Sequence, residues 1–255
     1  MAKHYLIKGD ALKIIPKINF MFDSVIVDPP YNTSHKNTKV LKGRKALSSD
    51  LGNWDYFSDQ EYLDFTINWI NSTKDKIKES GNLVIFCKLE YISDIKRIYE
   101  KLGFKHHATI IWHKTNPSPS IRKNGFLSSC EAILWATKGF DSKKISYTFN
   151  FFKQNEMHNF IETPICMGRE RTEHKTQKPK KVISRLMRIF TNKNDWVLDC
   201  FAGSGTTVLS AEEFGVNTVN IEIDSNYFDI MKNRTKKELG NQKVKIISNL
   251  KDIKK

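Results

Sequence analysis

The chain has 255 residues, of which 39% are hydrophobic and 27% charged, so it can bury a sizeable core and is not a disordered polymer. Its 42 Lys and Arg exceed its 28 Asp and Glu, and the formal net charge of +14 favours a polyanionic partner such as a nucleic acid. The four cysteines form no C-x-x-C pair, which argues against a zinc knuckle or a disulfide scaffold. The sequence has no signal peptide and no apolar run long enough to cross a membrane, so it predicts a cytoplasmic protein.

Short apolar runs that are typical of strands recur along the chain, separated by longer segments with helical period. The predicted strands are residues 5–7, 24–27, 83–86, 108–112, 132–135, 196–198 and 218–221. After Gly240 the chain is rich in lysine and a solvated end is the default interpretation, with Val244–Ile247 as a candidate edge strand. The predicted helices are one that follows Ser58 and ends at Gly81, one over 92–102 that stops at Gly103, and two over 179–190 and 205–214. This alternation predicts an α/β fold with a doubly wound, mostly parallel sheet.

Two segments break the alternation of strands and helices. Residues 32–57 are polar and basic, and residues 139–175 mix aromatic and polar side chains before they end in a basic stretch. Loops of this length inside a compact domain are usually functional or disordered. We therefore expect one domain over 1–255 that carries two functional segments.

A short motif, Asp28-Pro29-Pro30-Tyr31, directly follows the second predicted strand. Open α/β sheets bind ligands at the carboxyl ends of their parallel strands. The Asp28 carboxylate and the Pro29 carbonyl, which a rigid turn would fix, form an acceptor pair suited to an exocyclic amine, and Tyr31 offers a ring on which a base can stack. The same residues also suit a turn that only ends a strand, and the motif by itself leaves both interpretations open.

A second motif combines a strand end, a tight glycine turn and the start of a helix. Asp199 ends the strand, Phe201-Ala202-Gly203-Ser204-Gly205 forms the turn, and Thr206 and Thr207 begin the helix. Backbone N–H groups in such a turn can approach an anionic ligand. Because the turn lacks the third glycine of the dinucleotide fingerprint and the Walker lysine, nicotinamide and nucleoside triphosphate are disfavoured. Glu222, at the end of the next strand, is placed to hold ribose hydroxyls.

Together these motifs resemble the S-adenosylmethionine-dependent amino-methyltransferases of DNA. Because Asp28-Pro29-Pro30-Tyr31 precedes the glycine turn, the chain resembles their circularly permuted β group. His174-Lys175-Thr176-Gln177-Lys178-Pro179 is similar to that group's H-P-T-Q-K-P, with Lys175 at the place of the first proline. Gly9-Asp10, Trp112-His113-Lys114-Thr115-Asn116-Pro117 and Glu131-Ala132-Ile133-Leu134-Trp135 match further blocks, most like adenine methylases of the GANTC-recognising kind.

The resemblance implies a seven-stranded methyltransferase sheet. It also implies that a methyl group is transferred from S-adenosylmethionine to N6 of an adenine flipped out of duplex DNA, and that the reaction uses no metal. It implies that Asp10 binds the cofactor adenine, Glu222 the ribose and the glycine turn the methionine part, while His174 and Lys178 close over the cofactor, with Lys178 near its carboxylate. The implied catalytic residues are Asp28, Pro29, Pro30 and Tyr31. The implied cofactor-binding residues are Asp10, Ala11, Asp28, His174, Lys178, Pro179, Asp199, Phe201, Ala202, Gly203, Ser204, Gly205, Thr206, Thr207 and Glu222.

The resemblance also implies where DNA is bound. Residues 32–57 would form a mobile DNA-contacting loop, and residues 139–175 a short target-recognition region. Basic residues that could hold phosphates or read guanine edges are Lys36, Lys39, Lys42, Arg44, Lys45, Arg122, Lys123, Arg169 and Arg171. The shortness of the recognition region is compatible with a homodimer, and a cognate restriction endonuclease is a further partner consistent with the resemblance.

Two alternatives remain open from the sequence. One is a DNA cytosine-N4 methyltransferase on the same fold; Asp28 favours adenine, since the cytosine enzymes more often carry Ser at this position. The other is a non-catalytic DNA-binding module with a degenerate cofactor site, which the intact Asp28-Pro29-Pro30-Tyr31 motif and glycine turn disfavour. A role on RNA or as an oxidoreductase has less support.

Overall fold

The computed structural model describes residues 2–32, 57–120, 123–139 and 147–253. Over this part of the chain a single sheet has nine strands in the order β6-β4-β5-β3-β2-β7-β8-β1-β9. Neighbouring strands are parallel, except that β5 is antiparallel to β3 and to β4. The strands are β1 (His4–Lys8), β2 (Phe22–Val27), β3 (Ile77–Cys87), β4 (Phe104–Lys114), β5 (Cys130–Lys138), β6 (Phe160–Thr163), β7 (Trp196–Asp199), β8 (Asn217–Glu222) and β9 (Val244–Ile247).

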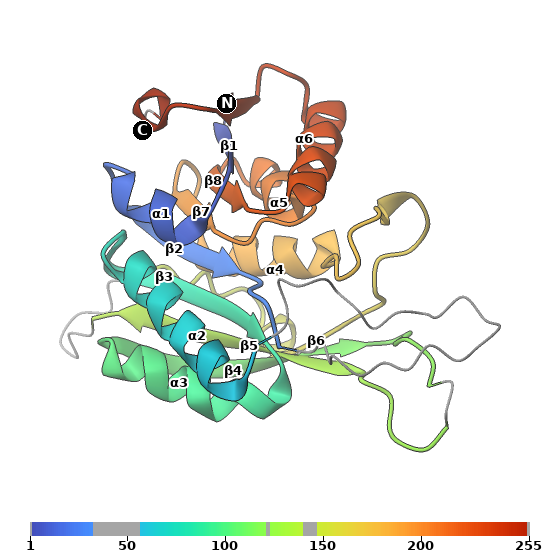
Figure 1. Ribbon diagram of the computed structural model, residues 1–255. Helices are drawn as coiled ribbons and strands as arrows, with labels where there is room; N and C mark the ends of the chain where they lie inside the picture. The colour runs from blue at the N-terminus through green and yellow to red at the C-terminus, as the bar shows by residue number, and fades with distance from the viewer. Residues whose placement is uncertain (1, 33–56, 121–122, 140–146, 254–255) are drawn as a thin grey trace.

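Helices cover both faces of this sheet, as a doubly wound fold requires (Figure 1). One face carries α1 (Ala11–Ile14), α2 (Asp59–Lys74) and α3 (Ile92–Lys101), and the other carries α4 (Lys180–Phe190), α5 (Thr206–Glu213) and α6 (Ser225–Leu239). Successive side chains of the central strands alternate between the two cores: Val25 and Val27 of β2 pack on the first face, and Ile26 packs on the second. This is why the strands read as continuous apolar runs in the sequence.

The strand count exceeds the predicted seven because two short edge strands add to the sheet. One of them, β9, coincides with the candidate edge strand after Gly240, where the sequence by default indicates a solvated end, and pairs with β1. The other, β6, lies inside residues 139–175, where no strand is predicted, and pairs with β4. Only Ile161 and Thr163 of its four residues are buried, so its sequence carries too short a pattern to be recognised.

The helix that follows Ser58 begins as predicted but ends earlier. The Ser58 side chain accepts from the Glu61 N–H, and the Glu61 carboxylate accepts from the Ser58 N–H, so the capping box is complete. The helix ends at Lys74 instead of continuing to Gly81. Gly81 lies inside β3, where the register against β2 shifts between Phe22 and Ser24. A Cβ on Gly81 would lie 2.9 Å from the Asp23 carbonyl oxygen, so this glycine permits a close strand approach.

The remaining predicted helices agree with the structure within a residue or two. Helix α3 stops before Gly103, and α4 follows Pro179, which occupies its N-cap position. In the described part of the chain, no helix is long and apolar enough to cross a membrane. All four cysteines are free thiols, and no group of three or more Asp, Glu, His or Cys residues among the described ones is arranged to hold a metal ion.

Candidate active site

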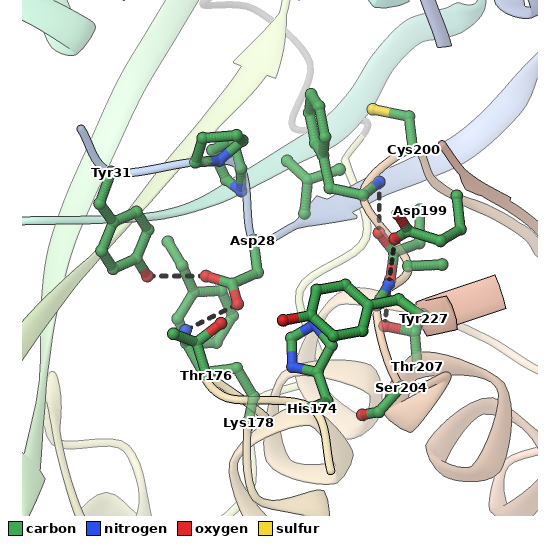
Figure 2. Close-up of a pocket in the computed structure, with 18 of the residues that line it drawn as sticks. Asp28, Tyr31, His174, Thr176, Lys178, Asp199, Cys200, Ser204, Thr207 and Tyr227 are labelled. Carbon is green, nitrogen blue, oxygen red and sulfur yellow. Dashed lines mark hydrogen bonds and ion pairs between the residues drawn. The ribbon is translucent and has the colours of Figure 1, made fainter. Parts of the chain in front are cut away.

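A cavity of about 550 Å³ opens at the carboxyl ends of the parallel strands, and both sequence motifs line it. Asp28, Pro29, Pro30 and Tyr31 follow β2 on one side, and Ala202, Gly203 and Ser204 follow β7 on the other. Figure 2 shows Asp28 and Tyr31 facing this space from one side and Asp199, Ser204 and Thr207 from the other. The two motifs are therefore parts of one site, although the chain separates them widely.

Both carboxylate oxygens of Asp28 have a donor in this structure. The Tyr31 hydroxyl donates to Asp28 Oδ1 at 2.7 Å, and the Lys178 ammonium donates to Oδ2 at 2.6 Å (Figure 2). The Lys178 ammonium also lies 4.9 Å from the centre of the Tyr31 ring. The sequence predicts Lys178 near the cofactor carboxylate; here its ammonium forms an ion pair with Asp28.

A second carboxylate, Glu131, lies beside this pair and shares its donors. Glu131 Oε2 accepts from the Tyr31 hydroxyl at 3.0 Å and lies 3.3 Å from the Lys178 ammonium. Its other oxygen, Oε1, lies 2.8 Å from the ammonium of Lys114. Two carboxylates, two ammonium groups and one phenol thus form a compact cluster with balanced charge, which is the arrangement that makes buried ions tolerable.

The surroundings of the two carboxylates push their pKa values apart. Burial raises the pKa of Asp28, although Lys178 opposes the shift. Burial acts on Glu131 in the same direction, but the two lysines outweigh it and lower the Glu131 pKa. Burial works against the charge of Lys178, yet attraction to Asp28 and Glu131 raises its pKa. Glu131 is therefore the firmly ionised carboxylate, and Asp28 is the better proton acceptor.

Glu131 reaches the cavity because β5 runs against its neighbours. Its partner in β4 is Trp112, near the carboxyl end of that strand, and the next residue, Ala132, pairs with Cys87 at the end of β3. The amino end of an antiparallel strand thus lies at the same edge as the carboxyl ends of the parallel strands. No local pattern in the sequence reports strand direction, so sequence reasoning did not include Glu131 or Lys114 in the site.

The glycine turn is held by a carboxylate at each end. Asp199 accepts from the Phe201 N–H at 3.1 Å and from the Thr207 hydroxyl at 2.6 Å. Glu222 accepts from the Gly203 N–H at 2.8 Å. Burial raises the pKa of Asp199 to about 7, despite these hydrogen bonds, and the nearby Asp28 and Glu222 add to the shift. The cavity wall is therefore rich in acceptors and suits a cationic ligand.

The far end of the cavity is formed by the loop after β1 and the end of β8. Asp10 caps α1 by accepting from the Leu12 N–H at 3.0 Å, and Asp10 and Ala11 both line the cavity. Glu222 also accepts from the Asp224 N–H at 2.8 Å, and burial raises its pKa. Both acidic residues that the resemblance assigns to a nucleoside thus lie at one end of the same space.

His174 lies directly over the glycine turn. A Cβ on Gly203 would approach His174 Nε2 to 2.7 Å, and Gly203 has a φ of +50°. The His174 ring packs on Tyr227, with ring centres 4.1 Å apart. Burial, and then the nearby cations, lower its pKa to about 4, so the ring is neutral near pH 7. Among the described residues its buried Nδ1 has no hydrogen-bond partner, which leaves a polar atom available to a ligand.

Two predicted cofactor residues do not line the cavity. Pro179 caps α4 and is buried. Gly205, with a φ of +75°, caps α5 and packs on Met231 of α6, where a Cβ would lie 2.8 Å from Met231 Cγ. Both residues position the segments that carry the lining residues.

The loop before α4 and the glycine turn are braced by residues to which the sequence analysis assigns no role. Gln177 Nε2 donates to the Glu170 carbonyl at 2.7 Å, and Gln177 Oε1 accepts from the Thr172 N–H at 2.8 Å. On the other side, Arg234 of α6 donates to the Ser204 carbonyl at 3.2 Å and to the Thr206 hydroxyl at 3.1 Å. These contacts fix the loop before α4 and the glycine turn. The further lining residues that sequence reasoning did not assign to the site include Phe57, Phe65, Trp69, Phe86, Lys88, Lys114, Cys130, Glu131, Asp224 and Tyr227.

The predicted DNA-contacting residues fall into two groups. Lys123 lies exposed on the connection between β4 and β5; Ser128 of this connection and Cys130, the first residue of β5, line the cavity. Arg169 is exposed in η5 (Gly168–Glu170), and Arg171 follows it and donates to the Lys175 carbonyl at 2.9 Å. Lys36, Lys39, Lys42, Arg44, Lys45 and Arg122 lie outside the described residues.

Comparison with known proteins gives this site its context. The model of a family described as "DNA methylase" matches residues 22–233. The chain belongs to the DNA methylase family. This DNA methylase is 31% identical to the type II methyltransferase M2.LlaDCHI of Lactococcus lactis subsp. cremoris. The alignment extends over 240 residues and covers 91% of this chain and 89% of the relative.

Solved structures agree with the observed fold of this DNA methylase. A complex of M1.HpyAVI with S-adenosylmethionine has a TM-score of 0.72 and 29% identity, with 91% of this chain and 98% of the other covered. The cytosine-N4-specific PvuII DNA methyltransferase has a TM-score of 0.69 at 17% identity, with 92% and 86% covered. The second likeness establishes the methyltransferase fold alone.

Proposed function

We propose that this DNA methylase is an adenine-N6 methyltransferase of the circularly permuted β group, and that it uses S-adenosylmethionine. The observation that carries the proposal is that Asp28 and the glycine turn at Gly203 line one cavity. Asp28 supplies an acceptor for an exocyclic amine, and the glycine turn adjoins the space for the methyl donor. The order of the two motifs along the chain supports the permuted group.

The residues around the cavity fit S-adenosylmethionine. Asp10 and Glu222 offer carboxylates to an adenine amine and to ribose hydroxyls, and both line the cavity. The His174 ring lies over the turn at Gly203, and its unpartnered Nδ1 and the turn would hold the methionine part. When bound, S-adenosylmethionine supplies a methyl group on a cationic sulfur, a charge that the Asp199 carboxylate and its acidic neighbours favour. The M1.HpyAVI complex with this cofactor supports the assignment.

The target amine would be oriented by Asp28 and the Pro29 carbonyl. The adenine N6 lone pair is delocalised into the ring, so it is a poor nucleophile until both N6 hydrogens are held and the nitrogen becomes more tetrahedral. Tyr31 would stack on the base. Positioning of this kind can lower the activation barrier by about 7–11 kcal/mol. The nitrogen becomes strongly acidic on methylation, and Asp28, whose pKa is raised by burial, would accept its proton.

The target lies inside the stacked duplex, so the base must be flipped out to reach the cavity. We infer that the basic segment 32–57 closes over the DNA and that residues 139–175 read the target sequence, with Arg169 and Arg171 at base edges and Lys123 at a phosphate. The relative M2.LlaDCHI is a type II methyltransferase. We therefore propose a role in a type II restriction–modification system with a cognate endonuclease. The substrate would be bacterial DNA in the cytosol or nucleoid.

A methyl-transfer assay tests the assignment of the base. The protein is incubated with tritiated S-adenosylmethionine and duplexes that contain or lack adenine, and the labelled nucleoside is identified after digestion. We expect N6-methyladenine and no label in adenine-free duplexes. N4-methylcytosine would instead support the cytosine enzyme, whose fold the PvuII methyltransferase shares, and tight DNA binding without label would indicate a non-catalytic module.

The substitution Asp28→Ala tests the role of the carboxylate. Removing Asp28 deletes the acceptor of the target amine, but it leaves Glu222 and the glycine turn unchanged. We expect methyl transfer to fall below detection while calorimetry still measures cofactor binding. Near-normal turnover in this variant would contradict the amine-holding role.

A further inference from the structure

The Glu131 carboxylate has no role in the mechanism described so far, yet it is one of the most strongly engaged groups of the cavity. Its side chain is 15% exposed, and it contacts Lys114, Lys178 and Tyr31. Taking such an anion out of water costs free energy even where its charge is paired. The arrangement therefore needs an explanation beyond packing.

The explanation begins with the state of Asp28. Tyr31 and Lys178 occupy its two oxygens at 2.7 and 2.6 Å. Each oxygen of a carboxylate can accept two hydrogen bonds, but the negative charge that Lys178 and Tyr31 hold is not offered to the amine or to its proton. Asp28 therefore becomes a stronger acceptor for the amine once these donors move. In a buried site a displaced ammonium needs another anion, since an unpaired buried charge is strongly unfavourable.

Glu131 is that second anion. Its Oε2 already lies 3.0 Å from the Tyr31 hydroxyl and 3.3 Å from the Lys178 ammonium, so small shifts transfer both donors from one carboxylate to the other. Lys114, on the neighbouring strand, holds Oε1 at 2.8 Å and leaves Oε2 for this exchange. Both ammonium groups then stay paired with Glu131, and the Asp28 carboxylate exchanges its ion pair for the hydrogens of the target amine.

We propose that Glu131 is a positioning residue that takes over the Tyr31 hydroxyl and the Lys178 ammonium when the target base enters, so that Asp28 is free to hold the amine. This inference rests on the proposed function and extends it. The opposed pKa shifts agree with it, since Glu131 stays ionised while Asp28 is the more basic carboxylate.

The exchange also fits the proton balance of the reaction. One nitrogen–carbon bond forms and one sulfur–carbon bond breaks, with the electron pair of the broken bond left on sulfur. The proton that leaves the methylated nitrogen goes to the freed oxygen of Asp28. Lys178, held by Glu131 at that moment, does not compete for the same oxygen.

The isosteric substitution Glu131→Gln removes the charge but keeps the shape. With a neutral partner, Lys178 remains on Asp28, so we expect kcat to fall about 10- to 100-fold, the range expected for loss of charge-assisted hydrogen bonds. The KM for DNA and the Kd for S-adenosylmethionine should change little. Glu131→Asp, which keeps the charge, should retain more activity than Glu131→Gln. A matched control is Glu212→Gln, which alters a partly buried carboxylate that contacts His4 and Lys243 away from the cavity and should leave kcat unchanged.

A double substitution separates exchange from structural damage. In the Lys178→Met background the main competitor for Asp28 is absent, so adding Glu131→Gln should cost at least about fivefold less than it does alone, a coupling expected between contacting residues. Additive losses, a raised cofactor Kd, or normal kcat in Glu131→Gln would overturn the inference. A wild-type protein that transfers no methyl group to DNA would instead refute the proposed function, so the two failures are distinct.

Discussion

Three carboxyl groups that line the cavity, the partly buried Asp28 and the buried Asp199 and Glu222, have pKa values that burial raises. Each is therefore less stable as an anion in the folded protein than in water. A cationic ligand compensates for this cost, so the groups favour ligand binding at the expense of the empty protein's stability.

Asp199 gives a measurable form of this trade-off. Its pKa rises from 3.8 to about 7 on folding, so the folded state binds the extra proton between these values. The stability contribution is fully present below pH 3.8 and is lost as pH rises through about 7. Between pH 5 and 8 the titration of Asp199 should lower the unfolding free energy of the wild type by about 3 kcal/mol. We expect this decrease to be absent in Asp199→Asn. Urea denaturation at several pH values measures this, with the exposed Asp64→Asn as a control that should keep the wild-type dependence.

For single residues, a place in the site can be predicted from the sequence where the neighbouring residues in the chain indicate it. Asp28 follows an apolar strand and precedes two prolines, and Gly203 lies in a strand–turn–helix sequence, so local sequence indicates their place. Glu131 of β5 contacts both Lys178 and Lys114, and Lys114 comes from another strand, β4. Their part in the site depends on strand direction and tertiary packing, which local sequence does not contain.

At the scale of elements, the glycine turn depends on α6 as much as on its own residues. Arg234 donates to Ser204 and Thr206, and Met231 packs where a Cβ of Gly205 would lie. The turn is thus pressed between α6 and the loop that carries His174. A change on the buried face of α6 should reach the cavity through this contact.

Two glycine substitutions separate backbone strain from this packing. Gly205 and Gly103 both have positive φ, at +75° and +89°, but a Cβ at Gly205 would lie 2.8 Å from Met231 Cγ, whereas Gly103 has open space. Gly205→Ala should therefore lower the unfolding free energy by about 1–3 kcal/mol more than Gly103→Ala, the usual cost of overpacking. Chemical denaturation of both variants gives the comparison, and equal losses would show that α6 does not constrain the turn.

Element prediction succeeded for the buried strands and for α3, α4 and α5, and it failed where the pattern is short or interrupted and at α6, a helix of 15 residues that was not predicted. The buried strands and the start of α2 at Ser58 were predicted because apolar runs and a capping box are local signals. Gly81 was misread as a helix end because a glycine inside a strand and one after a helix look alike in sequence. Strand β6 was missed because only Ile161 and Thr163 are buried.

For the whole molecule, the formal net charge of +14 predicts binding to DNA that depends steeply on salt. Each phosphate contact releases counterions, so the logarithm of the affinity falls linearly with the logarithm of salt concentration. On the proposed function, Lys123→Gln should weaken binding equally on all sequences and reduce the salt slope by about one.

A base-reading residue behaves differently from a phosphate-binding one. If Arg169 reads a guanine, Arg169→Gln should cost about 1–3 kcal/mol of discrimination at one position of the target. Fluorescence anisotropy with cognate and substituted duplexes at several salt concentrations measures both quantities. Arg97→Gln, on the exposed part of α3 in an ion pair with Asp94, serves as a control expected to change neither. Uniform weakening by Arg169→Gln would assign that residue to a phosphate.

The antiparallel pairing of β4 and β5 has a consequence for folding fidelity. Sliding β5 by two residues would keep Ile133 and Trp135 facing the same core, so hydrophobic burial alone tolerates the error. The slide would nevertheless carry Glu131 about 7 Å along the strand and leave Lys178 with a single counterion. The irregularity between His106 and Ala108 is suited to block such slippage, because an extra residue on one strand matches its partner at only one offset. Correct alignment of this hairpin is thus a requirement of the chemistry that hydrophobic burial by itself does not enforce.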